Sequence, residues 1–318
     1  MDTLEIIDVT TIARSSRHET IFRHFELLNP GESFAISNDH DPAPLQAEMR
    51  SRYGNSVGWE YMENGPAVWI VKLTKTADDY SHKTIAEIVT KDIRTAKIFR
   101  KYGIDFCCGG KKPVAEVCAQ KNIDVNTIMA ELVTSGTDRD GGSANADKWE
   151  LDFLTGYIVN FHHSYVKESI PTIRLWAEKV AKVHGDHNPE TIRIAHLFIE
   201  IADELTAHMF KEENVLFPYI VDLVNARKNG QPAVMRGFGT VVNPIRMMEH
   251  EHETVGNWFK EIETLSANFT PPEYACNTFR ALYSALKEFE DDLFLHIHLE
   301  NNILFPKAIA LESESQTR

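Results

Sequence analysis

The residues of this chain best suited to metal chemistry form two copies of one pattern, H-x-x-x-E-x-x-[VI]-L-F-P. The first copy begins with His208 and Glu212, and the second begins with His296 and Glu300. On a helix, residues four apart lie on one face, with their Cβ atoms roughly 5–6 Å apart. Each copy therefore directs an imidazole and a carboxylate at one point, and its closing proline predicts that the helix ends there.

A single histidine precedes each copy by a nearly equal interval, His163 in the first case and His252 in the second. If each half of this repeat forms a pair of antiparallel helices, the two halves place four imidazoles and two carboxylates around one bundle axis. This is a ligand set for two metal ions, which the two carboxylates could bridge. The predicted metal ligands are His163, His208, Glu212, His252, His296 and Glu300.

The same polar groups would be expensive in a bundle core without metal. Each unpaired group would cost about 1–3 kcal/mol, and their sum would rival the roughly 5–15 kcal/mol that keeps a domain folded. Imidazole with carboxylate suits iron, manganese or zinc. Six side chains cannot saturate two octahedral ions, so at least one position is expected to stay open for water, an oxo bridge or a small diatomic ligand.

Other residues close to the predicted ligands are candidates for orienting them. Glu204 lies one helical turn before His208 and could orient its ring, and Glu251 is the immediate neighbour of the next ligand, His252. The other interpretation, which is slightly favoured for both glutamates, is a solvated surface position. Three further histidines are one or two positions from ligands and are expected to point roughly 100–200° away around their helices: His162, His250 and His298.

Cys107 and Cys108 are the second chemical feature, because they precede two glycines and two lysines. This favours a tight, accessible turn, and the lysines favour the thiolate form. A reactive pair of thiols that acts as a relay and a pair of small residues in a turn between helices are both compatible with the pattern. A zinc site is disfavoured, because no second cysteine pair could complete four ligands. Adjacent cysteines also suit a disulfide framework poorly, which favours a reducing, cytoplasmic setting.

The elements that must position these residues fall into four regions. Residues 1–76 read as a small α/β domain, in which strand patterns alternate with helix patterns and a hairpin turns at Asn64-Gly65-Pro66. Residues 77–136 form a short helical domain that carries the paired cysteines, and residues 137–147 form a polar linker. Residues 148–318 contain four long amphipathic patterns, which predict an antiparallel four-helix bundle.

The N-terminal region resembles a small uncharacterised bacterial domain family with the sulfur-carrier type of two-layer fold. The sulfur-carrying cysteine of that fold is missing here, since the loop carries Asp41 and Pro42. This departure argues against persulfide transfer. His18, His24 and His40 could form a small polar site, or they could be surface and turn residues.

Composition limits the classes of partner. Lys and Arg total 33 and Asp and Glu total 47, which gives a formal net charge of −14. An acidic chain is poorly suited to nucleic acid or an anionic membrane as its main partner. No apolar run approaches the roughly 20 residues of a membrane span. A homodimer is compatible with the sequence.

Several motifs together resemble the repair-of-iron-centres proteins of the YtfE/ScdA type: Asp105-Phe-Cys107-Cys108-Gly-Gly-Lys, Lys182-Val-His-Gly-Asp186, His208-Met-Phe-Lys-Glu-Glu213, Glu251-His252-Glu253 and the second copy of the repeat. The resemblance implies a haemerythrin-like four-helix bundle behind a short helical domain with paired cysteines. It also implies a non-haem di-iron centre, two iron ions with oxo or hydroxo and carboxylate bridges, on the same six ligands. The α/β domain before them is a departure from the shorter members.

The function implied by this resemblance is the repair of iron–sulfur clusters damaged by nitrosative or oxidative stress, through iron delivery or nitric oxide handling. The partners would be iron–sulfur proteins and a small diatomic ligand, NO or O2, in the cytoplasm. The alternatives are an enzyme, a nitric oxide reductase or peroxidase, and a haemerythrin-like sensor that binds O2 or NO. The sensor is disfavoured, because a fifth histidine at a suitable helical position is not apparent.

Overall fold

The computed structural model describes residues 4–28, 31–53, 56–76, 80, 83–107, 109–135, 146–232 and 236–316. Cys108 lies outside these described residues. The chain divides into two compact units, each with its own core. The first unit comprises Met1–Lys83 and Pro113–Gly142, and the second comprises Thr84–Lys112 and Ser143–Arg318. The segment that ends with the first cysteine therefore belongs to the same unit as the bundle.

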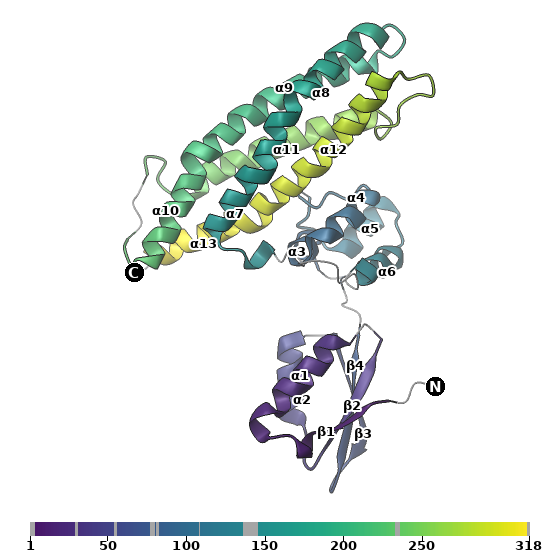
Figure 1. Cartoon of the computed structure of the whole chain (residues 1–318), viewed down its shortest axis with the longest axis vertical. Helices are drawn as coiled ribbons and strands as arrows, with labels where there is room; N and C mark the ends of the chain where they lie inside the picture. Colours follow the sequence, from purple (N-terminus) through teal and green to yellow (C-terminus); the bar gives the residue numbers. More distant parts are fainter. Residues whose placement is uncertain are drawn as a thin grey trace. The chain divides into compact units, whose positions relative to one another are not determined.

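The first unit contains a four-stranded sheet with the strand order β1-β2-β4-β3 (Figure 1). Its elements are β1 (Ile6–Asp8), α1 (Arg17–Leu27), β2 (Ser33–Asn38), α2 (Ala43–Tyr53), β3 (Val57–Asn64) and β4 (Trp69–Lys75). Strand β1 runs parallel to β2, because α1 carries the chain back between them, whereas β4 is antiparallel to both β2 and β3. We call this part the sheet domain, and it has the two-layer α/β architecture that the sequence predicts.

The core of the sheet domain lies between the sheet and its two helices. Phe25 from α1 and Met49 from α2 pack against Ile36 of β2 and Val71 of β4, and all four side chains are almost completely buried. Ile36 and Val71 are cross-strand partners, so their side chains lie on the same face of the sheet. The first unit also contains α5 (Val114–Lys121) and α6 (Val125–Ser135).

The second unit is a bundle of long helices with a short helix pair attached (Figure 1). Its elements are α3 (Ile85–Lys91), α4 (Ala96–Lys101), α7 (Leu151–Tyr157), α8 (Ser164–His184), α9 (Glu190–Lys211), α10 (Phe217–Lys228), α11 (Val242–Leu265), α12 (Asn277–Leu299) and α13 (Phe305–Gln316). Helix α8 packs against α9 and α12, and α9 packs against α11. This arrangement confirms the predicted antiparallel four-helix bundle.

Apolar residues at helical spacing account for the packing of the bundle. In α9 the buried positions include Ile194, Phe198, Ile201 and Leu205, which repeat at intervals of three or four residues. Such a stripe gives the helix one apolar face, and the bundle forms by burying these faces together. None of the helices in the part of the chain that the structure describes has the length and apolar character needed to span a lipid bilayer.

The prediction that each repeat ends its helix is wrong. Pro218 lies in the first turn of α10, and Pro306 lies in the first turn of α13, so the chain stays helical through both L-F-P triplets. A π-helical turn precedes each proline, Glu212–Leu216 in one case and Glu300–Leu304 in the other. Phe217 donates its N–H to the carbonyl of Glu212, five residues earlier. This wider turn accommodates a proline that a regular α-helix would exclude.

Candidate metal centre

The six residues predicted as ligands come from four helical stretches and meet in the core of the bundle. His163 closes the π-helical turn Ile158–His163 between α7 and α8, and His252 lies in α11. The two histidines of the repeat lie in the last turns of α9 and α12, and each glutamate begins the π-helical turn that follows. All six side chains are at most 1% exposed.

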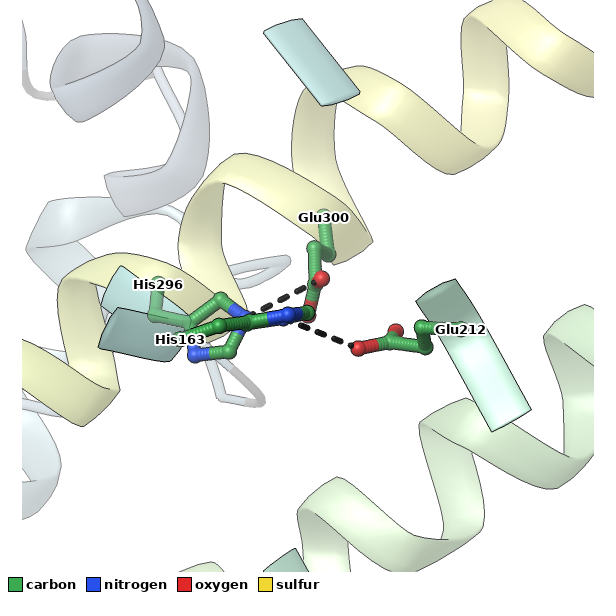
Figure 2. Close-up of side chains that lie close together, drawn as sticks. All are labelled: His163, Glu212, His296 and Glu300. Carbon is green, nitrogen blue, oxygen red and sulfur yellow. Dashed lines mark hydrogen bonds and ion pairs between the residues drawn. The ribbon is translucent and has the colours of Figure 1, made fainter. Parts of the chain in front are cut away.

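The ligand atoms of these residues form two groups that share both carboxylates. The first group is His163, Glu212, His296 and Glu300, and the second is His208, Glu212, His252 and Glu300. Within each group the ligand atoms all lie within 4.8 Å of one another. Figure 2 shows the first group, in which Glu300 lies on the same helical stretch as His296 and Glu212 reaches the site from another helical stretch. Two neighbouring ion positions bridged by Glu212 and Glu300 fit this geometry.

The individual distances place each carboxylate between the two groups. Glu212 Oε2 lies 3.3 Å from His163 Nε2 and 3.3 Å from His208 Nε2. Glu300 places Oε1 3.1 Å from His296 Nε2 and Oε2 3.2 Å from His252 Nε2. Two ligand atoms bound at about 2.1 Å to one ion, with about 90° between the bonds, would lie about 3.0 Å apart. The observed separations are close to this value.

The hydrogen bonds of two imidazoles leave a lone pair on Nε2 when these rings are neutral. His208 Nδ1 lies 2.8 Å from Glu251 Oε2, and His252 Nδ1 lies 2.9 Å from the side-chain oxygen of Asn301. Both partners are acceptors, so each neutral ring carries its proton on Nδ1. In that neutral form the two Nε2 atoms would face each other at 3.0 Å with no proton between them, so the pair requires a proton or a metal ion. A cation bound by both nitrogens would remove this repulsion.

Electrostatics within the core favours a cation at the same place. Burial lowers the pKa of His208, but the carboxylate of Glu212 raises it more, so that the pKa reaches about 10. Burial raises the pKa of Glu300, but its imidazole neighbours, with the charge of His296 as the largest contribution, together lower it more and hold that pKa well below its usual range. Two buried carboxylates at this spacing require positive charge, which protons on the imidazoles or metal ions can provide.

Several buried atoms of the centre lack any hydrogen-bond partner among the described residues. They include His163 Nε2, both oxygens of Glu212 and Glu300 Oε2. Unsatisfied atoms that are this deeply buried are costly, and metal coordination would satisfy all of them together. The donor set of imidazole nitrogen and carboxylate oxygen is compatible with iron.

The repeat also explains the residues around the ligands, which the sequence analysis missed. The residue after each repeat glutamate contacts Nδ1 of the single histidine in the same half. Glu213 lies 2.7 Å from His163 Nδ1, and Asn301 lies 2.9 Å from His252 Nδ1. The phenylalanine of each L-F-P triplet stacks on that same ring, at 5.7 Å for Phe217 and 6.1 Å for Phe305 between ring centroids. The recurrence of polar and phenylalanine residues at equal positions in both copies was the available signal.

Of the two candidate orienting glutamates, only Glu251 contacts a ligand. It bonds to Nδ1 of His208 and is also paired with Lys211. Glu251 therefore acts across the bundle on the ring from α9 and not on its neighbour His252. The structure shows no hydrogen bond between Glu204 and His208, because the Nδ1 of that ring faces α11. His250 is exposed, as predicted.

His162 does not point away from the centre, which corrects the prediction for this residue. Its side chain is 3% exposed, and its ring stacks on His296 at 5.4 Å with an interplanar angle of 7°. Its Nδ1 lies 2.9 Å from Asp292 Oδ1, while Nε2 has no hydrogen-bond partner. The prediction assumed α-helical spacing, but the π-helical turn Ile158–His163 is wider and directs two consecutive histidines inward.

Cys107 lies against the outer side of the helix that carries His296 and Glu300. Its backbone oxygen accepts a hydrogen bond from Asn302 at 3.2 Å, and its thiol lies 3.2 Å from Asp105 Oδ1. The expectation of an accessible turn is wrong for Cys107, which is 2% exposed. The role of Cys108 remains a prediction, since that residue lies outside the described part of the chain.

The segment around Cys107 is fixed to the bundle by several polar contacts. Arg100 of α4 pairs with the buried Glu290 and with Asp291 on α12, and Lys260 of α11 lies 3.0 Å from Asp105. His298, fully buried, faces this segment and not the centre, with Nδ1 3.4 Å from the carbonyl oxygen of Phe106. His298 thus points away from the ligands, as predicted.

A cavity of about 420 Å³ lies beside Cys107 and reaches the surroundings of the centre. Cys107, Asp105, Lys260 and Asn301 are among its lining residues. Asn301 also bonds to the ring of His252, so one side chain contacts both the cavity and a residue of the second group. The cavity therefore connects the surroundings of the cysteine with those of the candidate ligands.

Comparison with known protein families matches three regions of the chain to three families. Residues 156–308 match the hemerythrin HHE cation binding domain, and residues 81–135 match the ScdA_N family, described as a domain of unknown function (DUF542). Residues 6–75 match a separate family described as an uncharacterized conserved protein (DUF2249).

Similar proteins include the iron-sulfur cluster repair protein YtfE of Yersinia pseudotuberculosis serotype O:1b (strain IP 31758) and that of Yersinia pestis (strain Pestoides F). Each is 37% identical to this chain over 235 residues, which cover 73% of this chain and 98% of the relative. The chain belongs to the family of YtfE-type iron–sulfur cluster repair proteins.

Proposed function

We infer that this chain holds two iron ions, one in each His/Glu group, and uses them to restore damaged iron–sulfur clusters in other proteins. The observation that carries this proposal is the pair of four-residue groups that share Glu212 and Glu300. A single ion would need only one group, whereas two groups with two common carboxylates suit a bridged pair. The repair function is supported by the family to which the chain belongs, and the same family does not favour a reductase, peroxidase or sensor.

The protein's own residues would prepare the centre for this function. When bound, the iron pair would supply one-electron redox chemistry, Lewis acidity and an open position for a small diatomic ligand. The shared carboxylates of Glu212 and Glu300 would balance the charge, and the buried surroundings would exclude bulk water. Because the protein provides only six ligands, the ions would not be enclosed completely.

An iron donor must also release its cargo, and the outer hydrogen bonds of the two groups differ in a way that suits release. Glu251 accepts a hydrogen bond from His208 in the second group. The corresponding ring in the first group, His296, has a buried Nδ1 without a partner. Outer hydrogen bonds of this kind raise metal affinity roughly 10–100-fold. We therefore assign the first group, with His163 and His296, as the position from which iron leaves more readily.

Cys107 is our candidate for an intermediate metal contact between the centre and solvent. It lines the cavity that also contains Asn301, the partner of His252. A thiolate is a good ligand for iron. Its replacement by serine keeps the size of the side chain and removes most of this affinity. We expect Cys107→Ser to leave the iron content unchanged and to slow iron transfer.

The experiment that tests the proposed function combines metal analysis with transfer on one sample. Purified protein is expected to contain about two irons per chain and to rebuild the cluster of an apo-ferredoxin in the presence of a sulfide source. Glu300→Gln should reduce both the iron content and the transfer, because it removes one shared carboxylate while keeping the side-chain shape. Glu204→Gln is the matched control on a glutamate without a ligand contact. One iron per chain, or full cluster repair by iron-free protein, would refute the proposal.

A further inference from the structure

A second cavity lies in the sheet domain, and its lining residues precede all of the candidate metal ligands in the sequence. It has a volume of about 600 Å³ and opens where β1 and β2 end and α1 and α2 begin. Because β1 and β2 are parallel, their carboxyl ends meet at the same edge of the sheet. Crevices at the carboxyl ends of parallel strands are common ligand sites in α/β proteins.

The floor of this cavity is apolar. Val9, Ile21, Ile36 and Leu45 all line it and are at most 4% exposed. They belong to the core of the sheet domain, so the floor is rigidly held. Such a floor favours a ligand with an apolar portion, because that portion would remove the apolar surface of the floor from contact with water.

Asn38, at the end of β2, places one polar atom in this otherwise apolar floor. Its side chain is 6% exposed, and its Nδ2 donates to the carbonyl oxygen of His40 at 2.9 Å. This bond fixes the orientation of the amide, and the remaining Oδ1 has no hydrogen-bond partner. A buried acceptor of this kind requires a donor. The ligand should therefore carry an O–H or N–H group.

The rim of the cavity is basic, in contrast to the acidic chain as a whole. Arg14, Arg17, His18 and His40 line it, and Asp39 is the one carboxylate in the lining. Each histidine is paired with a carboxylate, His18 with Glu48 and His40 with Asp39, so the two arginines supply the positive charge. Arg17 is held in place by the carbonyl oxygens of Ile12 and Thr10, at 3.0 and 3.2 Å. Among the residues that the structure describes, Arg14 has no ion-pair or hydrogen-bond partner. Guanidinium groups in such positions attract an anion.

Other occupants fit less well. No group of three metal-ligating side chains occurs in the described part of the sheet domain, because both groups found lie in the bundle. Sulfur transfer by the domain itself would need a cysteine, and the first cysteine of the sequence is Cys107. Two guanidinium groups also disfavour a cationic ligand.

We propose that the sheet domain binds a small organic anion in this cavity, with the anionic group at Arg14 and Arg17, the apolar portion on the floor and a donor group on Asn38 Oδ1. The anionic group is a carboxylate or a phosphate. This site is separate from the candidate metal centre, and anion binding there does not depend on iron.

The test uses the full-length, iron-loaded protein and isothermal titration calorimetry with five probes. These are 4-hydroxybenzoate, benzoate, phenyl phosphate, inorganic phosphate and the neutral 4-hydroxybenzyl alcohol. We expect saturable 1:1 binding of at least one aromatic anion. Removal of the hydroxyl donor should weaken carboxylate binding about tenfold, and the neutral alcohol should bind much more weakly than 4-hydroxybenzoate. Tighter binding of phenyl phosphate than of 4-hydroxybenzoate would identify a phosphate as the anionic group.

Arg14→Gln removes an exposed, unpaired charge and is not expected to affect folding, but it should weaken anion binding about tenfold or more. Arg23→Gln, an exposed position of α1 outside the cavity, is the matched control and should bind normally. Iron content should be unchanged in both variants, so the anion-binding result can be judged independently of the proposed iron site. The proposal is overturned if no aromatic anion binds at millimolar concentration, if Arg14→Gln binds like the parent, or if inorganic phosphate binds as tightly as phenyl phosphate.

Discussion

At the scale of single residues, the two halves of the candidate metal centre are near copies, and one of their differences is the residue before the single histidine. The residue before each single histidine reaches the repeat histidine of the opposite half. In one half this residue is Glu251, which accepts a hydrogen bond from His208. In the other half it is His162, whose ring stacks flat on His296 and accepts no bond from it. The same backbone position therefore supports one ligand and leaves the other without an acceptor.

This difference predicts two rates of iron loss. On exposure to excess chelator, the iron-loaded protein should release about half of its iron quickly and the rest on the order of 10–100 times more slowly. The fast phase should come from the group with His163 and His296. Stopped-flow absorbance of the iron–chelator complex measures both phases. A single exponential for all of the iron would show that the two positions are equivalent.

Glu251→Gln should remove most of this difference. The amide is a weaker acceptor than the carboxylate, so His208 loses the charged partner that increases its basicity. We expect the slow phase to become roughly tenfold faster or more and the iron retained after dialysis against chelator to fall. Glu204→Gln, one turn before His208 on the same helix but without a bond to it, should match the parent protein. Equal effects of the two substitutions would indicate a general charge effect instead of the specific bond.

At the scale of elements, the sequence predicted most of the structure wherever regular periodicity applied. Apolar intervals of three or four residues located the bundle helices, and alternation together with Asn64-Gly65-Pro66 located the β3–β4 hairpin. The repeat with its two preceding histidines predicted which six side chains meet, because i and i+4 share a face of any helix. The inference about the six side chains also required the assumption that the two halves pack as antiparallel helix pairs around one axis.

Two features that the sequence did not predict depend on departures from the regular helix. A proline within a helical pattern normally predicts that the helix ends there. The chain nevertheless stays helical through Pro218, because a π-helical turn precedes it. The same type of turn brings His162 inward beside His163, where α-helical geometry would separate them by about 100°. The π-helical turns depend on packing between helices, so no pattern within one helix reveals them.

The contact between α4 and α12 predicts a stability effect that depends on pH. Burial raises the pKa of Glu290 to about 7, although Arg100 beside it lowers that pKa. The carboxylates of Glu290 and Asp291 in turn raise the pKa of Arg100, so the ion pair is favourable. Its effect on the pKa of Glu290 is nevertheless smaller than the effect of burying that carboxylate. Because the folded-state pKa of Glu290 exceeds its ordinary value of 4.5, its contribution to stability is greatest below pH 4.5 and is lost as the pH rises through about 7.

Glu290→Gln should therefore become more stable relative to the parent as the pH rises from about 5 to 8. The neutral amide avoids the burial of charge at every pH, and the gain should reach at most about 3 kcal/mol. Urea unfolding of iron-loaded protein at several pH values measures the difference. Glu288→Gln, at an exposed position of the same helix, should show no such trend. A parent–variant difference that stays constant with pH would contradict the role assigned to burial of Glu290.

At the scale of the whole molecule, the candidate metal centre and the sheet domain belong to different compact units. All six candidate ligands and their hydrogen-bond partners belong to the second compact unit. The YtfE relatives align over 98% of their own length while leaving more than a quarter of this chain unmatched. The sheet domain matches a family of its own. The two parts thus supply different chemistry, a metal centre in one and an anion cavity in the other.

This separation predicts that a chain shortened to residues 77–318 keeps its iron and its cluster repair, because no candidate ligand is removed. Its iron content and its rate of cluster rebuilding should lie within about twofold of the full-length values, and its titration with the aromatic anions should show no heat of binding. Loss of iron from the shortened chain, despite a circular dichroism spectrum that shows folded helices, would mean that the sheet domain contributes to the metal centre. Retained anion binding would place that site outside the sheet domain. The two readouts therefore test the two halves of the functional assignment independently.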